Sequence, residues 1–363
     1  MTAIQPRLPK LLAPLVTLAC ALALLTALGG SSEEVPLRQD ARDADALLGA
    51  ATRAGFRHDF AAQLRLGVEA RRLMPGTVSA YPEIADAQVE LGRYGAAERT
   101  LQRLLDVKPN LTSYSRVSYF RELHGDLDGA VDAMRLAVSA GGGAPEDVAY
   151  VQVLLGDLQL QRGRIGAARR AYTSALRSSP GYPAGMVGLA RADAAGGDLG
   201  RAAVRLRRAA ERLPLTATLT LLAEVERELG RPAAADRALA AARAQQRLYR
   251  EADTLPDAEA VIFEADHGSP TGAVRLGRRV WNAAPSVRSA DALGWALTVA
   301  GRPRAGYAYS RRALGLGSRD ALFRLHAGVA ASRAGRAAEA REHLRVAQLG
   351  KAALSPAHRE LLR

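Results

Sequence analysis

Side chains of the kinds that most often carry chemistry are few in this sequence, and their spacing matches no catalytic pattern. The 363 residues include six histidines and one cysteine, Cys20. There is no HExxH pair for a catalytic zinc, no Gly-Lys-Ser/Thr to cradle a phosphate and no G-x-S-x-G nucleophile elbow. A lone cysteine allows neither an intramolecular disulfide nor a cysteine cage for a metal. The sequence therefore predicts a protein that is not an enzyme and has no catalytic residue, no cofactor and no metal site.

Two local patterns invite a chemical interpretation that the rest of the sequence does not support. Residues 124–129, His-Gly-Asp-Leu-Asp-Gly, resemble the start of a calcium loop, but the later bidentate Glu is missing and the segment coincides with a predicted turn. His124 and His267 each precede a glycine that we place in a turn. A polar residue that finishes a helix is the simpler interpretation of both. Asp126 and Asp198, which follow such glycines, are predicted to cap helices.

Arginine dominates the charge of the chain. Lysine and arginine together number 50 against 37 aspartates and glutamates, for a net charge of +13, and only three of the 50 are lysines. Arg201, Arg205, Arg208 and Arg212 are spaced 4, 3 and 4 residues apart, which places them in one stripe on a helix. One interpretation is a surface for anionic cell-envelope polymer or lipid headgroups; the other is a hydrated outer face whose arginine stems cover apolar surface. Interleaved acids and an aromatic content of 5% argue against nucleic acid as the partner.

The first 34 residues differ from the rest in hydropathy. Residues 1–10 carry Arg7 and Lys10 but no acid, residues 11–28 are mainly apolar, and Gly-Gly-Ser-Ser-Glu-Glu follows. This pattern is typical of an export signal. We predict that residues 1–29 are a cleaved signal peptide or, since the apolar run approaches the ~20 residues that span a bilayer, an uncleaved membrane anchor. A lipoprotein signal at Cys20 is a third alternative. In each case we expect the rest of the chain beyond the cytoplasmic membrane, secreted or anchored.

The remainder of the sequence repeats itself at intervals of 33 to 38 residues, and glycines at positions 92, 125, 163, 197, 230, 268, 301 and 335 mark the period. Five residues after each glycine stands a small residue, alanine in seven of the eight copies. Twelve residues after it stands another small or apolar residue. Residues at this spacing share one face of a helix, so each unit is predicted to hold two amphipathic helices of about 12 residues around a glycine turn.

Prolines and irregular separations predict where the units end or differ. Pro109, Pro180, Pro214 and Pro285 are expected to end second helices, because proline cannot donate the next backbone hydrogen bond. Two separations of 38 residues predict a longer loop at residues 141–147 and an extended helix around 247–255. A helical hairpin of this size cannot bury its apolar face alone, so each unit must stack on its neighbours.

The repeat resembles the tetratricopeptide repeat, a helix–turn–helix unit of about 34 residues. The resemblance rests on Leu155-Gly156, on Ala168 followed four residues later by Tyr172, and on Pro180. It implies an all-α, right-handed α-solenoid of about eight or nine units. The expected organisation is a signal peptide or anchor at residues 1–29, a linker at 30–43, a repeat array at 44–350 and a C-terminal capping helix at 351–363.

The resemblance also implies where a partner binds. Proteins of this family bind a peptide or protein on the concave face, which the first helix of each hairpin lines. Residues six before each turn glycine, such as Tyr119 and Trp295, are expected on that face. The Lys and Asn clamp of the chaperone-binding members is missing from it, so that activity is not implied. The residues that we predict to bind the partner are Arg116, Tyr119, Asp157, Arg191, Glu224, Arg288 and Trp295.

Among these residues, aromatic and arginine side chains are the strongest candidates, because they give large contact area at modest ordering cost. The predicted function is a non-enzymatic protein–protein interaction scaffold that binds a peptide or protein in the concave groove. The alternative is an electrostatic adaptor that binds anionic envelope polymer or lipid headgroups through arginine-rich helix faces. Association with the membrane would come from the N-terminal segment, and the sequence does not determine the oligomeric state.

Overall fold

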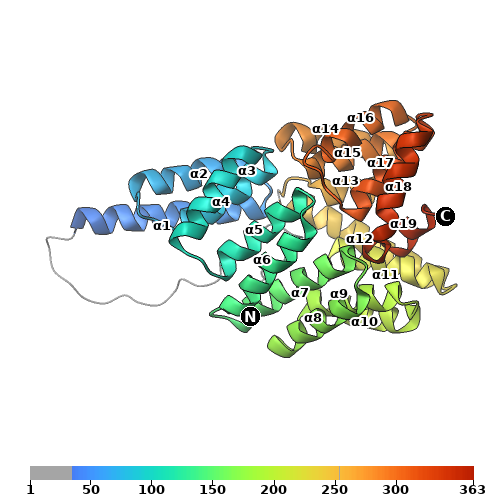
Figure 1. Cartoon of the computed structure of the whole chain (residues 1–363), viewed down its shortest axis with the longest axis horizontal. Coiled ribbons are helices and arrows are strands. Elements are labelled where there is room, and N and C mark those ends of the chain that lie inside the picture. Colours follow the sequence, from blue (N-terminus) through green and yellow to red (C-terminus); the bar gives the residue numbers. More distant parts are fainter. Residues whose placement is uncertain (1–34, 253) are drawn as a thin grey trace, which may run out of the picture.

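The chain is an all-α solenoid. The computed structural model describes residues 35–252 and 254–363, and these ranges contain no β-strand. Consecutive helices pair into nine hairpins that stack one after another (Figure 1). No helix in the described ranges has both the length and the apolarity that crossing a bilayer requires. Residues 1–29 lie outside these ranges, so the predicted signal peptide or anchor stays a prediction.

The helices have the following bounds. The first five hairpins are α1 (Val35–Phe56) with α2 (Phe60–Leu73), α3 (Ala80–Glu90) with α4 (Tyr94–Val107), α5 (Leu111–Leu123) with α6 (Leu127–Ala140), α7 (Pro145–Gln161) with α8 (Ile165–Ser178), and α9 (Pro183–Ala195) with α10 (Leu199–Arg212). The last four are α11 (Thr216–Glu228) with α12 (Pro232–Glu251), α13 (Ala258–His267) with α14 (Pro270–Ala283), α15 (Val287–Val299) with α16 (Pro303–Ala313), and α17 (Ala321–Arg333) with α18 (Ala337–Leu349). The 3-10 helix η1 (Lys351–Ala353) and α19 (Pro356–Glu360) close the chain.

Seven of the eight predicted turn glycines have φ between 69° and 87°, the left-handed region that side chains disfavour. The exception is Gly268, with a φ of −125°. There Ser269 caps α14 by accepting a hydrogen bond from the Gly272 N–H, and the turn takes another shape. In the first hairpin His58, with a φ of 60°, stands where the other turns have glycine.

The ring of Tyr172 explains why the repeat signature has glycine at position 156. The Tyr172 side chain on α8 is fully buried, and its ring packs against Gly156 of α7 and Gly188 of α9. A Cβ at either glycine would lie 2.3 Å from the ring. Glycine is needed at both positions because the interior is close-packed and has no room for a methyl group.

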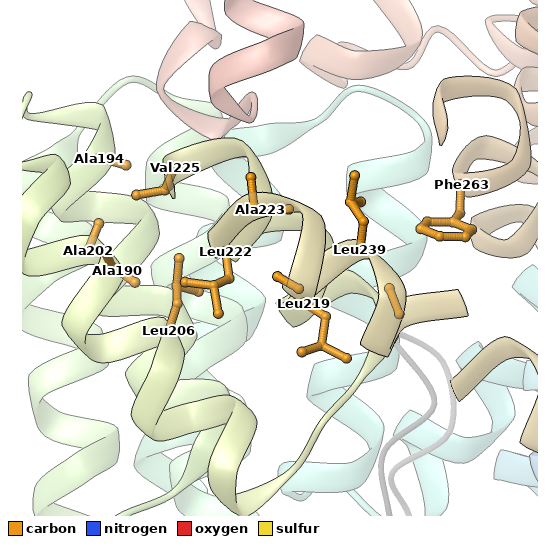
Figure 2. Close-up of a cluster of buried hydrophobic side chains, with 14 residues drawn as sticks. Ala190, Ala194, Ala202, Leu206, Leu219, Leu222, Ala223, Val225, Leu239 and Phe263 are labelled. Atoms are coloured by element: carbon orange, nitrogen blue, oxygen red, sulfur yellow. The ribbon is translucent and has the colours of Figure 1, made fainter. Parts of the chain in front are cut away.

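The core extends along the solenoid as a series of clusters shared by neighbouring hairpins. Figure 2 shows one of them, in which Leu206 of α10, Leu222 of α11, Leu239 of α12 and Phe263 of α13 come together. All four are buried. Burial therefore links each hairpin to the next, as expected for a repeat array.

Three predicted boundaries can be compared with the helices. The linker predicted at residues 30–43 is wrong for residues 35–43, because α1 begins at Val35. The long loop predicted at 141–147 is also wrong: only residues 141–144 separate α6 from α7, and the extra residues lengthen α7, with Pro145 at its first turn. The extended helix is confirmed, since α12 has 20 residues.

The solenoid curls until its two halves touch. The Val287 N–H donates to the Tyr94 hydroxyl at 2.7 Å, across 193 positions of sequence. Farther along the same seam the Leu255 N–H donates to the Arg57 carbonyl at 3.0 Å. In Figure 1 helix α15 accordingly lies beside α3 and α5, and Val287 shares a buried cluster with Val89 and Leu123. The first helices thus face a common interior between the two halves.

Candidate functional site

The concave face surrounds a central cavity of about 250 Å³. It collects four of the seven residues predicted to bind a partner, from four different first helices: Tyr119 on α5, Asp157 on α7, Arg191 on α9 and Arg288 on α15. The curl of the solenoid brings them together, because the positions six and thirteen before a turn glycine are seven residues apart and share the inner face of a first helix. This cavity is the candidate site.

Asp157 and Arg191 form an ion pair on the cavity wall. The Tyr172 hydroxyl donates a second hydrogen bond to Asp157 at 2.7 Å. Burial, reinforced by the Asp157 charge, raises the pKa of Tyr172 well above its usual value, so the phenol stays neutral. The repeat-signature tyrosine therefore also positions a carboxylate in the site.

Arg288 lies between this cavity and a second one of about 120 Å³. Burial acts to lower the pKa of Arg288, but Tyr119, Glu90 and Glu259 around it outweigh burial and raise that pKa. In the described part of the chain no side chain lies within ion-pairing or hydrogen-bonding distance of its guanidinium. Arg288 therefore interacts with these groups through its charge, which acts to lower the pKa of each.

Carboxyl groups are crowded around the same cavity. Burial raises the pKa of Glu122 to about 8, and the charges of Asp320 and Asp157 act in the same direction. Burial and the Asp257 charge raise the pKa of Glu259 to about 8 as well. Both glutamates accordingly hold a proton well above the pH at which an exposed glutamate releases it.

Sequence reasoning missed these carboxylates, although a signal for them was present. Glu122 and Glu259 stand three residues from Tyr119 and Ile262, which were expected on the concave face. One helical turn along the same face would have found both. No comparable signal existed for Asp320, because it lies in a connection between hairpins and enters the cavity only when the solenoid closes.

The other three predicted residues are engaged within the chain. Arg116 forms a two-bond pair with Asp86 at 2.8 and 2.7 Å, and the two side chains are 12% and 11% exposed. Trp295 is 4% exposed, because its Nε1–H donates to Asp266 at 2.6 Å and its ring stacks on His326. The prediction that Arg116 and Trp295 present open contact area is corrected by this placement: the superhelix buries them.

Glu224, the last of the seven, contacts the C-terminal end of the same chain. It accepts a hydrogen bond from the Ala357 N–H at 3.3 Å. On the same face the Arg191 guanidinium donates to the Ala353 carbonyl at 3.2 Å. Residues 351–362 therefore lie on the concave face as the 3-10 helix η1 followed by the short helix α19, and we call them the C-terminal segment.

A histidine fastens the C-terminal segment. His358 Nε2 lies 3.4 Å from Asp266 Oδ2. Burial acts to lower the pKa of His358, but the hydrogen bond and charge of Asp266, together with Glu224, outweigh burial and raise it. Ser355 caps α19, since its hydroxyl accepts a hydrogen bond from the His358 N–H.

The arginine stripe on α10 is partly neutralised. Arg205 pairs at 2.8 Å with Asp193, a fully buried carboxylate, and Arg201 pairs at 3.1 Å with Asp198. Arg208 is exposed. These pairs favour a structural role for half of the stripe.

The predicted helix caps are confirmed at Asp126 and Asp198. Each side chain accepts a backbone hydrogen bond at the start of a second helix, from Gly129 and Arg201. In the described part of the chain no three His, Cys, Asp or Glu side chains are grouped to hold a metal ion.

Two family models, both described as tetratricopeptide repeat, match residues 83–145 and 159–217. These two ranges are tetratricopeptide repeats. The matched ranges include the hairpin turns at Gly92, Gly125, Gly163 and Gly197, so the predicted period and the family agree over these units. No curated protein sequence matches this repeat protein.

The repeat array is similar to several solved structures. One is PilW, a widely conserved type IV pilus biogenesis factor, at 18% identity and a TM-score of 0.46, over 54% of this chain and 90% of that chain. Another is a tetratricopeptide repeat protein from Parabacteroides merdae, at 10% identity and a TM-score of 0.41, over 80% and 99%. A third is the APC/C hetero-tetramer Cut9–Hcn1, at 17% identity and a TM-score of 0.37, over 90% and 61%. These likenesses place no partner on this chain.

Proposed function

We propose that this scaffold binds a short peptide segment of a partner protein on its concave face and catalyses no reaction. Tetratricopeptide repeats in general mediate protein–protein interaction, and the array here has that architecture. That the concave face is the binding surface is our proposal, and its support is the C-terminal segment, which is bound on that face.

The observation that carries it is the recognition of a peptide backbone by the concave face within the chain itself. Arg191 donates to the Ala353 carbonyl at 3.2 Å, and Glu224 accepts from the Ala357 N–H at 3.3 Å. Arg359 of the segment donates in return to the Ala194 carbonyl at 3.0 Å. Backbone bonds give affinity and side-chain pairs such as His358–Asp266 give specificity. A partner segment with the same features would compete for the same contacts.

The C-terminal segment has an advantage over any partner because it is tethered. A tethered segment behaves as if present at millimolar concentration, so an external peptide competes poorly until the internal contacts weaken. A partner must therefore contribute more contact area than residues 351–362, or act where these contacts are loosened.

A labelled peptide tests this function in the full chain. The probe is the 13-residue sequence 351–363 carrying fluorescein, titrated while its anisotropy is recorded. Replacing His358 by Ala in the protein removes the internal pair with Asp266, so the peptide should bind this variant about tenfold more tightly than it binds the unchanged protein. Adding Asp266→Asn to His358→Ala should abolish the gain, because the histidine of the peptide then finds no carboxylate.

The matched control is Arg208→Ala, an exposed change on the outer helix α10 that should leave the peptide affinity unchanged. Equal affinity for all four proteins would contradict binding on the concave face. An affinity lost through Arg208→Ala would place the peptide on the outer face of α10 and would also contradict the proposal.

We also propose that the scaffold works beyond the cytoplasmic membrane, on the sequence of residues 1–29 alone. Mass spectrometry of the mature N-terminus, combined with fractionation, tests this. A protein in the cytoplasmic fraction with an intact N-terminus would contradict it.

A further inference from the structure

The positive charge of the protein is concentrated in one part of the array. Residues 268–319 contain nine arginines and a single acid, Asp291, so this stretch supplies +8 of the net charge of +13. Asp291 is fully buried and pairs with His326, so it contributes no charge to the surface. The outer surface formed by residues 268–319 therefore carries arginines without any acid of its own.

Six of these arginines project from the outer side of two second helices. α14 packs on α13 and α15, and α16 packs on α15 and α17, which leaves the opposite side of both helices to solvent. In Figure 1 the two helices lie along the top edge of the molecule. Spacings of three, four, seven and eight residues place the arginines on one side of each helix. All six are exposed: Arg275, Arg278 and Arg279 on α14, and Arg304, Arg311 and Arg312 on α16.

Two aromatic rings join the helices into one surface. Trp281 of α14 and Tyr309 of α16 meet edge to face, with 5.4 Å between their ring centroids. Arg312 lies over both rings, 5.8 Å from the Trp281 centroid and 4.7 Å from the Tyr309 centroid. The six arginines and these two half-buried rings therefore form one continuous patch, which we call the basic face.

The basic face lacks the ion pairs that neutralise other second helices. On α2, α6, α10 and α18 an exposed arginine pairs with an acid three residues away. Among the residues that the structure describes, no acid and no hydrogen-bond acceptor pairs with any of the six arginines of the basic face. Like charges held close together repel one another, so an anionic partner relieves a cost that the folded chain leaves uncompensated.

We propose that the basic face docks on the surface of an anionic lipid bilayer. Arginines two turns apart on one helix are separated by about 10 Å, and neighbouring helices lie about 8–10 Å apart. Charges spread in this way over an outer face match many single headgroup charges in a plane and do not converge on one compact anion. Trp and Tyr rings have an apolar body and a polar tip, which suits the boundary between headgroups and acyl chains. Docking here leaves the concave face free, so lipid binding is separate from peptide binding.

Co-sedimentation of the full chain with lipid vesicles tests the proposal. Vesicles of equal parts phosphatidylglycerol and phosphatidylcholine are compared with vesicles of phosphatidylcholine alone. The protein should prefer the anionic vesicles, and the preference should collapse between ~0.1 M and ~1 M salt, because the Debye length falls from ~10 Å to ~3 Å. Insertion of the apolar residues 11–28 would be common to both kinds of vesicle, so the preference is the readout and not the total amount bound.

The decisive variant combines Arg278→Gln, Arg304→Gln and Arg311→Gln. It should reduce the preference about hundredfold, since each arginine near an anionic bilayer contributes about fivefold in affinity. Replacing the same three arginines by Lys should keep the preference, because a headgroup surface responds to charge and does not require the planar fork of arginine.

The matched control combines Arg65→Gln, Arg99→Gln and Arg103→Gln, three exposed arginines on α2 and α4. It removes the same net charge and should keep the preference, and circular dichroism should show that both triple variants are folded. The proposal is overturned if the unchanged protein binds both kinds of vesicle equally, if the two Gln variants lose the preference equally, or if the Lys variant loses it. Binding of polyglutamate or duplex DNA through the same arginines, with anionic vesicles unbound, would also overturn it.

Discussion

The raised pKa of Glu122 should make the stability of the whole protein depend on pH. Burial, then the charges of Asp320 and Asp157, raise its pKa to about 8. The unfolded chain releases this proton near the ordinary value of ~4.3. Between these two values the folded state binds the extra proton, so the free energy of unfolding must fall as the pH rises, by up to ~1.4 kcal/mol per pH unit for this group.

Replacing Glu122 by Gln should flatten that dependence. The variant keeps an oxygen to accept the hydrogen bond from Gln161 but has no proton to lose. Urea unfolding at pH 5, 6, 7 and 8 should give a shallower decline for Glu122→Gln than for the unchanged protein. Glu69→Gln is the control, because the Arg72 hydrogen bond lowers the pKa of exposed Glu69 and its titration falls below this range. Parallel curves for Glu122→Gln and the unchanged protein would contradict the assignment.

His358 should make the docking of the C-terminal segment depend on pH. Burial opposes the proton, but Asp266 and Glu224 outweigh burial and raise the pKa of His358 in the folded state. Its stabilising effect is then fully present below the unfolded pKa of ~6.5 and is lost as the pH rises through the folded pKa. Once corrected for intrinsic exchange, amide protection in α19 should fall with rising pH in the unchanged protein and stay flat in His358→Gln.

At the scale of the elements, the hairpin turns require glycine for two separate reasons: a left-handed backbone and, at some turns, close approach of another segment. Gly92 and Gly230 share a left-handed backbone, with φ of 69° and 71°. A Cβ at Gly230 would meet nothing within 4 Å, whereas a Cβ at Gly92 would lie 2.4 Å from the Pro285 carbonyl across the seam. Gly230→Ala should therefore cost ~1 kcal/mol for backbone strain alone. Gly92→Ala should cost ~3 kcal/mol, because the two halves must also move apart.

Denaturant unfolding of the two variants measures the difference. Their equal destabilisation would mean that the halves do not touch at Gly92.

The same turns show what the sequence could and could not predict. The period of small residues and glycines predicted eight hairpins, because close helix packing requires the small residues and a left-handed turn favours glycine. The glycine period missed the turn of the first hairpin, because His58 stands there in place of glycine. Its Nδ1 lies 2.8 Å from the Leu255 carbonyl. Gly268 matched the pattern, yet its turn differs because Ser269 caps the next helix. Glycine spacing therefore predicts where a turn lies and not its backbone shape.

At the scale of the whole molecule, the central cavity follows from curvature that accumulates over many hairpins. Sequence periodicity reports only contacts between neighbouring units. The hydrogen bond from Val287 to Tyr94 depends on the small rotation at every interface between them. The sequence therefore predicted that the concave face holds Tyr119, Asp157, Arg191 and Arg288, but it did not predict that they line one cavity.

The closure itself can be tested at Tyr94. Its hydroxyl accepts from the first free N–H of α15, on Val287. Tyr94→Phe leaves that donor without a partner and should destabilise the protein by ~1–2 kcal/mol. Hydrogen exchange should accelerate at Val287 and its neighbours while the α10–α11 connection stays unchanged. Unchanged exchange at Val287 would contradict the contact between the halves.

The most direct test of the central claim follows the C-terminal segment while a competitor binds. In the His358→Ala protein, hydrogen exchange of residues 351–362 is recorded by mass spectrometry with and without a saturating, isotopically heavy peptide of sequence 351–363. If both occupy the concave face, exchange of the internal segment should accelerate when the peptide binds, and exchange at the outward-facing turn around Gly230 should not change. Binding of the peptide with the internal segment still protected would show that the concave face is not the binding surface.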